Sequence, residues 1–327
     1  MALDIKCYAP AVLAAATLLL GTPALAQWKP TKPIEIIVHT GPGGGADVLA
    51  RFVAQVVEKD KLAPVRMIVQ NKPGGGGLVA MNHVVERKGD THAIALFTSN
   101  WMTNPLTQSE AKVTVKDMTP VVRLMLDPAV IAVKPDSPFK TVKDFIDAAK
   151  ANPGKLKQSG GSITSRDNVI RQLMMKKTGT QWAFISFPGG GERIAALLGG
   201  HAELMILEPQ EAGDHLRAGT MRMLAQVVDK RLPGFPNVPT LKEAGIEIPN
   251  VSQARGVLAP PGIPAEVVAY YEALFARFVE TPAWKKYLID NHIEAGFLKS
   301  GELSTFMDKN IAEMREILRE TGAKVVR

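Results

Sequence analysis

Apolar residues along this chain alternate between short continuous runs and the spacing of a helix face. The run Ile36-Ile37-Val38 predicts a buried strand, and the apolar residues after Asp47 predict a helix. The alternation continues to the C-terminus and predicts an α/β fold. The further predicted strands are Ile34–His39 (which contains that run), Val65–Val69, Ala93–Thr98, Val121–Leu126, Val130–Val133, Ala202–Leu207 and Met221–Val228. The further predicted helices are Leu78–Glu86, Thr141–Ala149, Asp167–Lys177, Glu192–Leu198, Gln210–Ala218, Pro264–Val279, Thr281–Asn291 and Ser300–Thr321.

Three glycine-rich loops stand beside these predicted elements, at Gly41–Gly45, Gly74–Gly77 and Pro188–Gly191. A strand, a glycine loop and a helix in succession leave backbone N–H groups free at the helix start, where the helix dipole is positive. Such a place suits a carboxylate or a phosphate. We therefore interpret the loops as anion sites. A flexible loop without a ligand is the alternative for any one of them.

Gly41, Gly43 and Ala46 also fit the dinucleotide-binding pattern G-x-G-x-x-A. The next predicted strand leads into Gln70-Asn71, however, and not into the acidic residue that would hold a ribose. No glycine loop continues into G-K-[ST], so the sequence lacks a P-loop.

The N-terminus has the features of a secretory signal peptide over residues 1–26. Ala9–Leu20 is an apolar run, and Ala24-Leu25-Ala26 is a small-residue cleavage site. Cys7, the one cysteine, would be removed with this segment. We therefore expect a periplasmic protein without disulfides, which disfavours a nicotinamide enzyme because that cofactor pool is cytoplasmic.

The formal net charge is +7, and its lysines and arginines are interleaved with acids. Sparse aromatic residues give no support to nucleic-acid binding. The positive excess modestly favours the approach of an anionic ligand. A mature chain of about 300 residues suggests two domains or one large one.

Several motifs in this order resemble one family, the periplasmic solute-binding proteins of tripartite tricarboxylate transporters, known as Bug or TctC-like receptors. The resemblance covers essentially the whole mature chain. The motifs are Trp28–Ile34, the Gly-Gly-x-x-Asp element at Gly43–Asp47, Asn71–Gly77, Pro188–Gly200, Arg231-Leu232-Pro233, Val238–Gly245 and Gly256–Gly262.

The resemblance implies a type II periplasmic binding fold, in which two α/β domains joined by crossing strands enclose a ligand cleft. By analogy, domain 1 comprises residues 27–126 and 255–327, and domain 2 comprises residues 127–254. Val121–Val133 and Gln253–Ala259 would be the hinge strands. The resemblance further implies a non-enzymatic, monomeric receptor that passes a small organic acid to membrane permease subunits, with no cofactor, metal or nucleic acid.

The expected ligand site has contributions from both domains. Asp47 has two competing interpretations, as the N-cap of the helix that it precedes or as a ligand contact. The candidates in domain 1 are Gly43, Gly44, Gly45, Ala46, Asp47, Ser99 and Asn100. The candidates in domain 2 are Ser162, Thr164, Ser165, Arg166, Pro188, Gly189, Gly190 and Glu208.

Arg166 and Glu208 depart from the residues usual in the family. Arg166 could hold a second ligand carboxylate bidentately or lie in solvent on the first helical turn. Glu208 could hold Arg166 in place or meet a ligand amine. Ser165 could cap its helix without any ligand. The ligand stays open between di- or tricarboxylate, aromatic carboxylate, amino acid and nicotinate-like compounds.

Two other functions stay open from the sequence. The protein could be a secreted binding protein that contacts a signalling partner instead of a permease. A dinucleotide-dependent oxidoreductase is the second alternative, and it rests on the glycine pattern alone.

Overall fold

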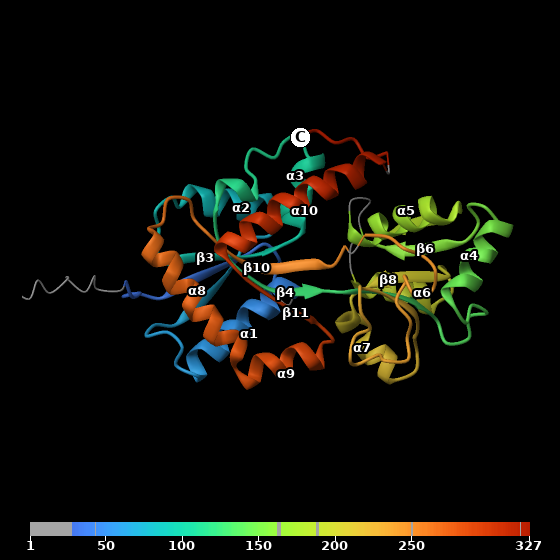
Figure 1. Cartoon of the computed structure of the whole chain (residues 1–327), viewed down its shortest axis with the longest axis horizontal. Helices are drawn as coiled ribbons and strands as arrows, with labels where there is room; N and C mark the ends of the chain where they lie inside the picture. The colour runs from blue at the N-terminus through green and yellow to red at the C-terminus, as the bar shows by residue number, and fades with distance from the viewer. Residues whose placement is uncertain (1–27, 43, 162–164, 188–189, 250, 321) are drawn as a thin grey trace, which may run out of the picture.

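A computed structural model describes residues 28–42, 44–161, 165–187, 190–249, 251–320 and 322–327. It contains two separate sheets with helices packed around each (Figure 1). We call the part around the six-stranded sheet the first lobe and the part around the five-stranded sheet the second lobe. This mixed α/β architecture confirms the predicted fold class.

The first sheet has the strand order β11-β4-β10-β3-β1-β2. The strands β1, β2 and β3 are parallel, whereas β10 is antiparallel to both of its neighbours. Parallel strands end at the same edge of a sheet, so the loops after β1 and β3 meet there. The strands are β1 (Ile34–Val38), β2 (Met67–Asn71), β3 (Ala93–Thr98), β4 (Thr119–Asp127), β10 (Gln253–Ala259) and β11 (Glu294–Lys299).

The second sheet has the strand order β7-β6-β8-β5-β9. Its strand β5 continues the path of β4 after a single residue, Pro128, so this segment joins the lobes directly (Figure 1). The strands are β5 (Ala129–Val133), β6 (Lys157–Gly160), β7 (Ala183–Ser186), β8 (Leu204–Leu207) and β9 (Arg222–Val227). The chain returns to the first lobe through β10. The exact domain boundaries stay a prediction.

Apart from α3, which was not predicted, the helices follow the predicted order with shifted ends. The first lobe carries α1 (Gly45–Lys59), α2 (Leu78–Glu86), α3 (Asn100–Thr107), α8 (Ala265–Glu280), α9 (Pro282–Asp290) and α10 (Ser300–Glu320), with short 3₁₀ turns at Gly75–Gly77 and Val115–Asp117. The second lobe carries α4 (Val142–Ala151), α5 (Arg166–Thr178), α6 (Gly190–Leu198) and α7 (Pro209–Arg217).

Local sequence explains two of these boundaries. The hydroxyl of Thr141 accepts a hydrogen bond from the backbone N–H of Asp144, and the Asp144 carboxylate accepts one from the backbone N–H of Thr141, so the two residues form a capping box at the start of α4. All four glycines of Gly74–Gly77 have positive φ, which side chains strongly disfavour. The second glycine loop therefore requires its glycines for backbone conformation.

The lobes are packed together by apolar contacts as well as joined by strands. One buried apolar cluster extends from Phe97 and Trp101 in the first lobe to Phe145 and Trp182 in the second. Helix α10 lies over the junction, near α5 (Figure 1). Within the described residues, no helix combines the length and apolar character that crossing a bilayer requires.

Candidate functional site

The first turns of four helices meet at a cavity of about 150 Å³ between the lobes. Asn100 begins α3 and Arg166 begins α5, while Arg193 lies in the first turn of α6 and Glu208 is the N-cap residue of α7. We call this the charged cavity. Its lining residues are Asn100, Ser165, Arg166, Asp167, Arg193, Ile206, Leu207, Glu208, Glu211 and Gln253. Both lobes therefore contribute to it.

Arg166 and Glu208 form an ion pair in this cavity. Nη2 of Arg166 donates to Oε1 of Glu208 at 2.7 Å, and both side chains are largely buried. The same guanidinium also donates to the backbone carbonyl of Asp127 through Nη1. Arg166 is therefore held against the end of β4 and bonded to Glu208, the first of the two arrangements that the sequence left open for Glu208.

Arg193 forms a second ion pair in the cavity. Its Nη2 donates to both carboxylate oxygens of Glu211, at 3.1 and 3.0 Å. Its Nη1 lies 3.8 Å from Asp167, whose carboxylate also accepts from the backbone N–H of Gly161 at 2.7 Å. The loop before α5 is therefore fastened to the start of α6.

A fully buried ion pair lies next to the cavity, where the two lobes join. Asp127 ends β4 with its side chain 0% exposed, and its Oδ2 accepts from Nε of Arg255 at 2.8 Å. Nη2 of Arg255 lies 2.5 Å from the same oxygen, and Gln210 donates to it at 3.2 Å. Oδ1 of Asp127 is buried and has no hydrogen-bond donor among the described residues.

The pKa values reflect this crowding of buried charges. Burial raises the pKa of Glu211 to about 7, with the nearby charge of Glu208 adding to the shift. Burial also opposes ionisation of Glu208, but the charges of Arg166, Arg255 and Arg193 outweigh it and hold the pKa of Glu208 below its usual value.

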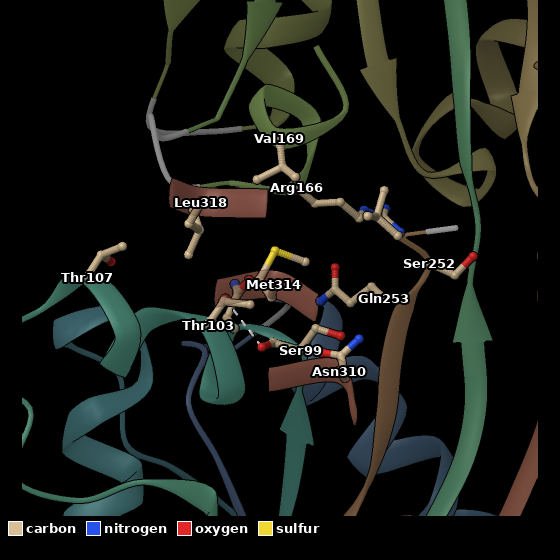
Figure 2. Close-up of a pocket in the computed structure, with 12 residues that line it drawn as sticks. Ser99, Thr103, Thr107, Arg166, Val169, Ser252, Gln253, Asn310, Met314 and Leu318 are labelled. Atoms are coloured by element: carbon tan, nitrogen blue, oxygen red, sulfur yellow. Dashed lines mark hydrogen bonds between the residues drawn. The ribbon is translucent and has the colours of Figure 1, made fainter. Parts of the chain in front are cut away.

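A second, apolar cavity of about 30 Å³ adjoins the first and shares Asn100, Arg166 and Gln253 with it. Figure 2 shows Met314 and Leu318 of α10 facing Val169 of α5 across this space. The volume is enough for about one water molecule. We call it the apolar cavity.

The family of this chain follows from comparison with known proteins. The family described as "Tripartite tricarboxylate transporter family receptor" matches residues 49–323. The chain belongs to this receptor family. A UPF0065 protein of Cupriavidus necator, from the gbd 5′ region, is 32% identical over 320 residues, which cover 96% of each chain.

Solved structures agree with this assignment. A TctC solute-binding protein from Polaromonas, without ligand, is 31% identical with a TM-score of 0.75, covering 89% of this chain and 99% of that chain. An R. palustris protein solved with adipate shares the fold at a TM-score of 0.81 and 24% identity, covering 90% and 98%. The family consists of periplasmic solute-binding receptors, so the prediction of a non-enzymatic protein is confirmed.

The receptor's first glycine loop lies at the start of α1. Gly44 is the N-cap residue of this helix, and Gly45 begins it. A β-carbon at Gly45 would lie 3.0 Å from Nη1 of Arg255, so the absent side chain leaves room for the guanidinium. Ala46 and Asp47 are buried within α1 and line neither cavity.

The prediction that Asp47 caps α1 is wrong, because the helix begins two residues earlier. Asp47 instead accepts from Arg51 through both carboxylate oxygens at 2.9 Å, and from Nδ2 of Asn71 at 2.9 Å. The bond to Asn71 ties α1 to the end of β2. The backbone N–H of Asp47 donates to the hydroxyl of Thr40, and this bond closes the glycine loop.

The remaining predicted residues take different places. Ser99 precedes α3 and lines the apolar cavity, and its hydroxyl accepts from the backbone N–H of Ala254 at 2.8 Å. Ser165 occupies the N-cap position of α5, but its hydroxyl donates to Asp167. Gly190 begins α6. The predicted site residues Gly43, Ser162, Thr164, Pro188 and Gly189 lie outside the described residues.

Sequence reasoning missed Arg255, Asp127, Arg193 and Glu211. Arg255 interrupts the apolar strand β10, and Asp127 ends the apolar strand β4 just before the apolar strand β5. A charged residue within an apolar run signals a buried partner, because an unpaired buried charge is costly. Arg193 and Glu211 carry no comparable signal, since each lies on an amphipathic helix.

Proposed function

We propose that this receptor captures a small organic carboxylate in the cleft between its lobes and delivers it to the membrane subunits of a tripartite tricarboxylate-type transporter. The observation that carries this proposal is the meeting of four helix N-termini, from both lobes, at the charged cavity. Free backbone N–H groups and the positive dipole ends favour a bound carboxylate there.

The arrangement of the lobes supports capture by closure. A ligand that contacts Asn100 or Gln253 on one side and Ser165 on the other binds the closed form better than the open form. It therefore shifts the equilibrium between them towards closure. The closed lobes then present a surface that the membrane subunits can distinguish from the unliganded form.

The R. palustris relative solved with adipate supports an organic acid as the ligand class. Several charge-assisted hydrogen bonds would give a micromolar affinity, which corresponds to about −8 kcal/mol. The direct test is isothermal titration of the purified mature protein with a panel of small mono-, di- and tricarboxylates. At least one acid should bind with a dissociation constant of about 1–100 µM. Failure of every organic acid to bind would overturn the proposal.

A further inference from the structure

We propose that the ligand of this receptor carries a cationic ammonium group in addition to its carboxylate, and that the acidic side chains of the charged cavity bind that ammonium group. The inference rests on the proposed function, because it concerns the ligand of the same cavity. It narrows the ligand class from organic acids in general to zwitterionic amino carboxylates.

The charges that line the cavity do not suit a dianion. Two guanidinium groups, Arg166 and Arg193, face three carboxylates, Asp167, Glu208 and Glu211. The side chains therefore carry a formal excess of one negative charge. The residues after position 27 that the structure leaves undescribed have no charged side chains, so they do not alter this balance. A second ligand carboxylate would meet repulsion, since like charges in a partly buried site interact strongly.

Both guanidinium groups already have carboxylate partners. Arg166 is bonded to Glu208 at 2.7 Å, and Arg193 to both oxygens of Glu211. The neighbouring Arg255 is bound to Asp127 in the same way. A ligand carboxylate that approached any of these arginines would compete with an existing bond. The backbone N–H groups at the helix starts are further donors for that carboxylate.

Glu211 is the most exposed of the four side chains in the cavity's two ion pairs. Its side chain is 32% exposed, against 16% for Glu208, 14% for Arg166 and 15% for Arg193, so a ligand donor can reach Glu211 most easily. Simple helix capping does not account for Glu208, because its side chain makes no capping hydrogen bond to α7. Burial, and after it the nearby charge of Glu208, raises the pKa of Glu211 to about 7, so its carboxylate takes up a proton readily near neutral pH. An ammonium group would take the place of that proton.

Matched pairs of ligands test the inference by calorimetry on the mature protein. The pairs are 4-aminobutanoate against succinate, 6-aminohexanoate against adipate, and 2-aminobutanoate against ethylmalonate. In the first two pairs an aminomethyl group replaces one carboxylate of the diacid, and in the third pair an amino group replaces it. In any pair of which one member binds, the zwitterion should bind at least about tenfold more tightly than the dicarboxylate, as expected for one charge-assisted hydrogen bond. Titrations at pH 7 in two buffers of different ionisation enthalpy should also show proton release on binding.

The outcomes separate this inference from the proposed function. A dicarboxylate that binds as tightly as its zwitterionic counterpart, or more tightly, overturns the inference and leaves the proposed function standing. Binding of neither member of any pair, together with failure of the wider acid panel, overturns both.

Two variants then test which residues carry the preference. Glu208→Gln and Glu211→Gln each remove the excess negative charge, so each should reduce the preference for the zwitterion at least about fivefold. Glu211→Gln keeps the bond between Arg166 and Glu208, so it carries the test if Glu208→Gln fails to fold. Glu247→Gln, an exposed glutamate of the second lobe bonded to Lys242, is the matched control and should change nothing. An unchanged preference in folded Glu211→Gln overturns the assignment.

Discussion

Breaking the buried pair of Arg255 and Asp127 should be one of the most destabilising single changes in this receptor. Asp127 is 0% exposed and Arg255 is 7% exposed, with Nε and Nη2 at 2.8 and 2.5 Å from the same carboxylate oxygen. Replacing Arg255 by methionine keeps most of the side-chain volume but leaves a buried carboxylate with Gln210 as a weak donor at 3.2 Å. We expect a loss of about 3–5 kcal/mol in unfolding free energy, the usual result of removing one partner of a buried pair.

Urea denaturation followed by tryptophan fluorescence measures this loss, with unfolding free energies obtained by linear extrapolation. The double variant Asp127→Asn/Arg255→Met removes both charges, so it should recover at least about 1 kcal/mol relative to Arg255→Met alone. The exposed pair Lys143–Asp147 of α4 provides the control, and Lys143→Met should leave the denaturation midpoint unchanged. A loss below about 1 kcal/mol for Arg255→Met, or no recovery in the double variant, would refute the reasoning.

Three further predictions concern the packing around the site. The pKa of His39 is lowered to about 4, first by burial and then by the charge of Arg255, so the native state keeps this ring neutral. The neutral ring's contribution to stability is complete above pH 6.5 and is lost as the pH falls towards 4. The difference in unfolding free energy between wild type and His39→Gln should therefore change by about 2–3 kcal/mol over that range. A difference that does not depend on pH would contradict this prediction. Gly256→Ala should cost about 1–3 kcal/mol in urea denaturation, because a β-carbon there would lie 2.2 Å from a backbone oxygen of the neighbouring strand, whereas Gly301→Ala, with open space around it, should cost nothing. Asp47→Ala should cost about 1–3 kcal/mol by the same assay, because it removes the acceptor for Asn71, and a neutral result would show that the α1–β2 bond is dispensable.

The sequence predicted the elements with a clear apolar pattern and missed several short elements without one. Strand β6 consists of Lys157–Gly160 and lacks an apolar run, yet its Gln158 and Ser159 are fully buried. Their side chains donate to the backbone carbonyls of Asp167 and Arg193, which satisfies polar groups that a local pattern marks as surface.

Helix α3 was missed for a different reason. It has eight residues and contains Pro105, which favours a loop in any reading of local propensity. Burial of Trp101 and Leu106 against the first lobe overrides that preference. Tertiary packing of this kind leaves no local signal in the sequence.

The residues of the candidate site likewise include some that the sequence predicted and some that it missed. Arg166 and Glu208 were predicted because each departs from the residue usual at its place in the family, and the structure joins them although they are 42 positions apart. Arg255 and Asp127 are 128 positions apart, and only the antiparallel pairing of β10 with β4 brings them together. Pairing between distant segments decides such contacts, and local patterns do not encode it.

A crystal structure of the mature protein with an organic acid that it binds in solution tests the central claim most directly. The account predicts that the ligand lies between the two lobes, with its carboxylate within hydrogen-bond distance of backbone N–H groups at the helix starts around the charged cavity. A carboxylate bound elsewhere, in contact with one lobe alone and remote from Asn100, Ser165 and Gln253, would contradict it.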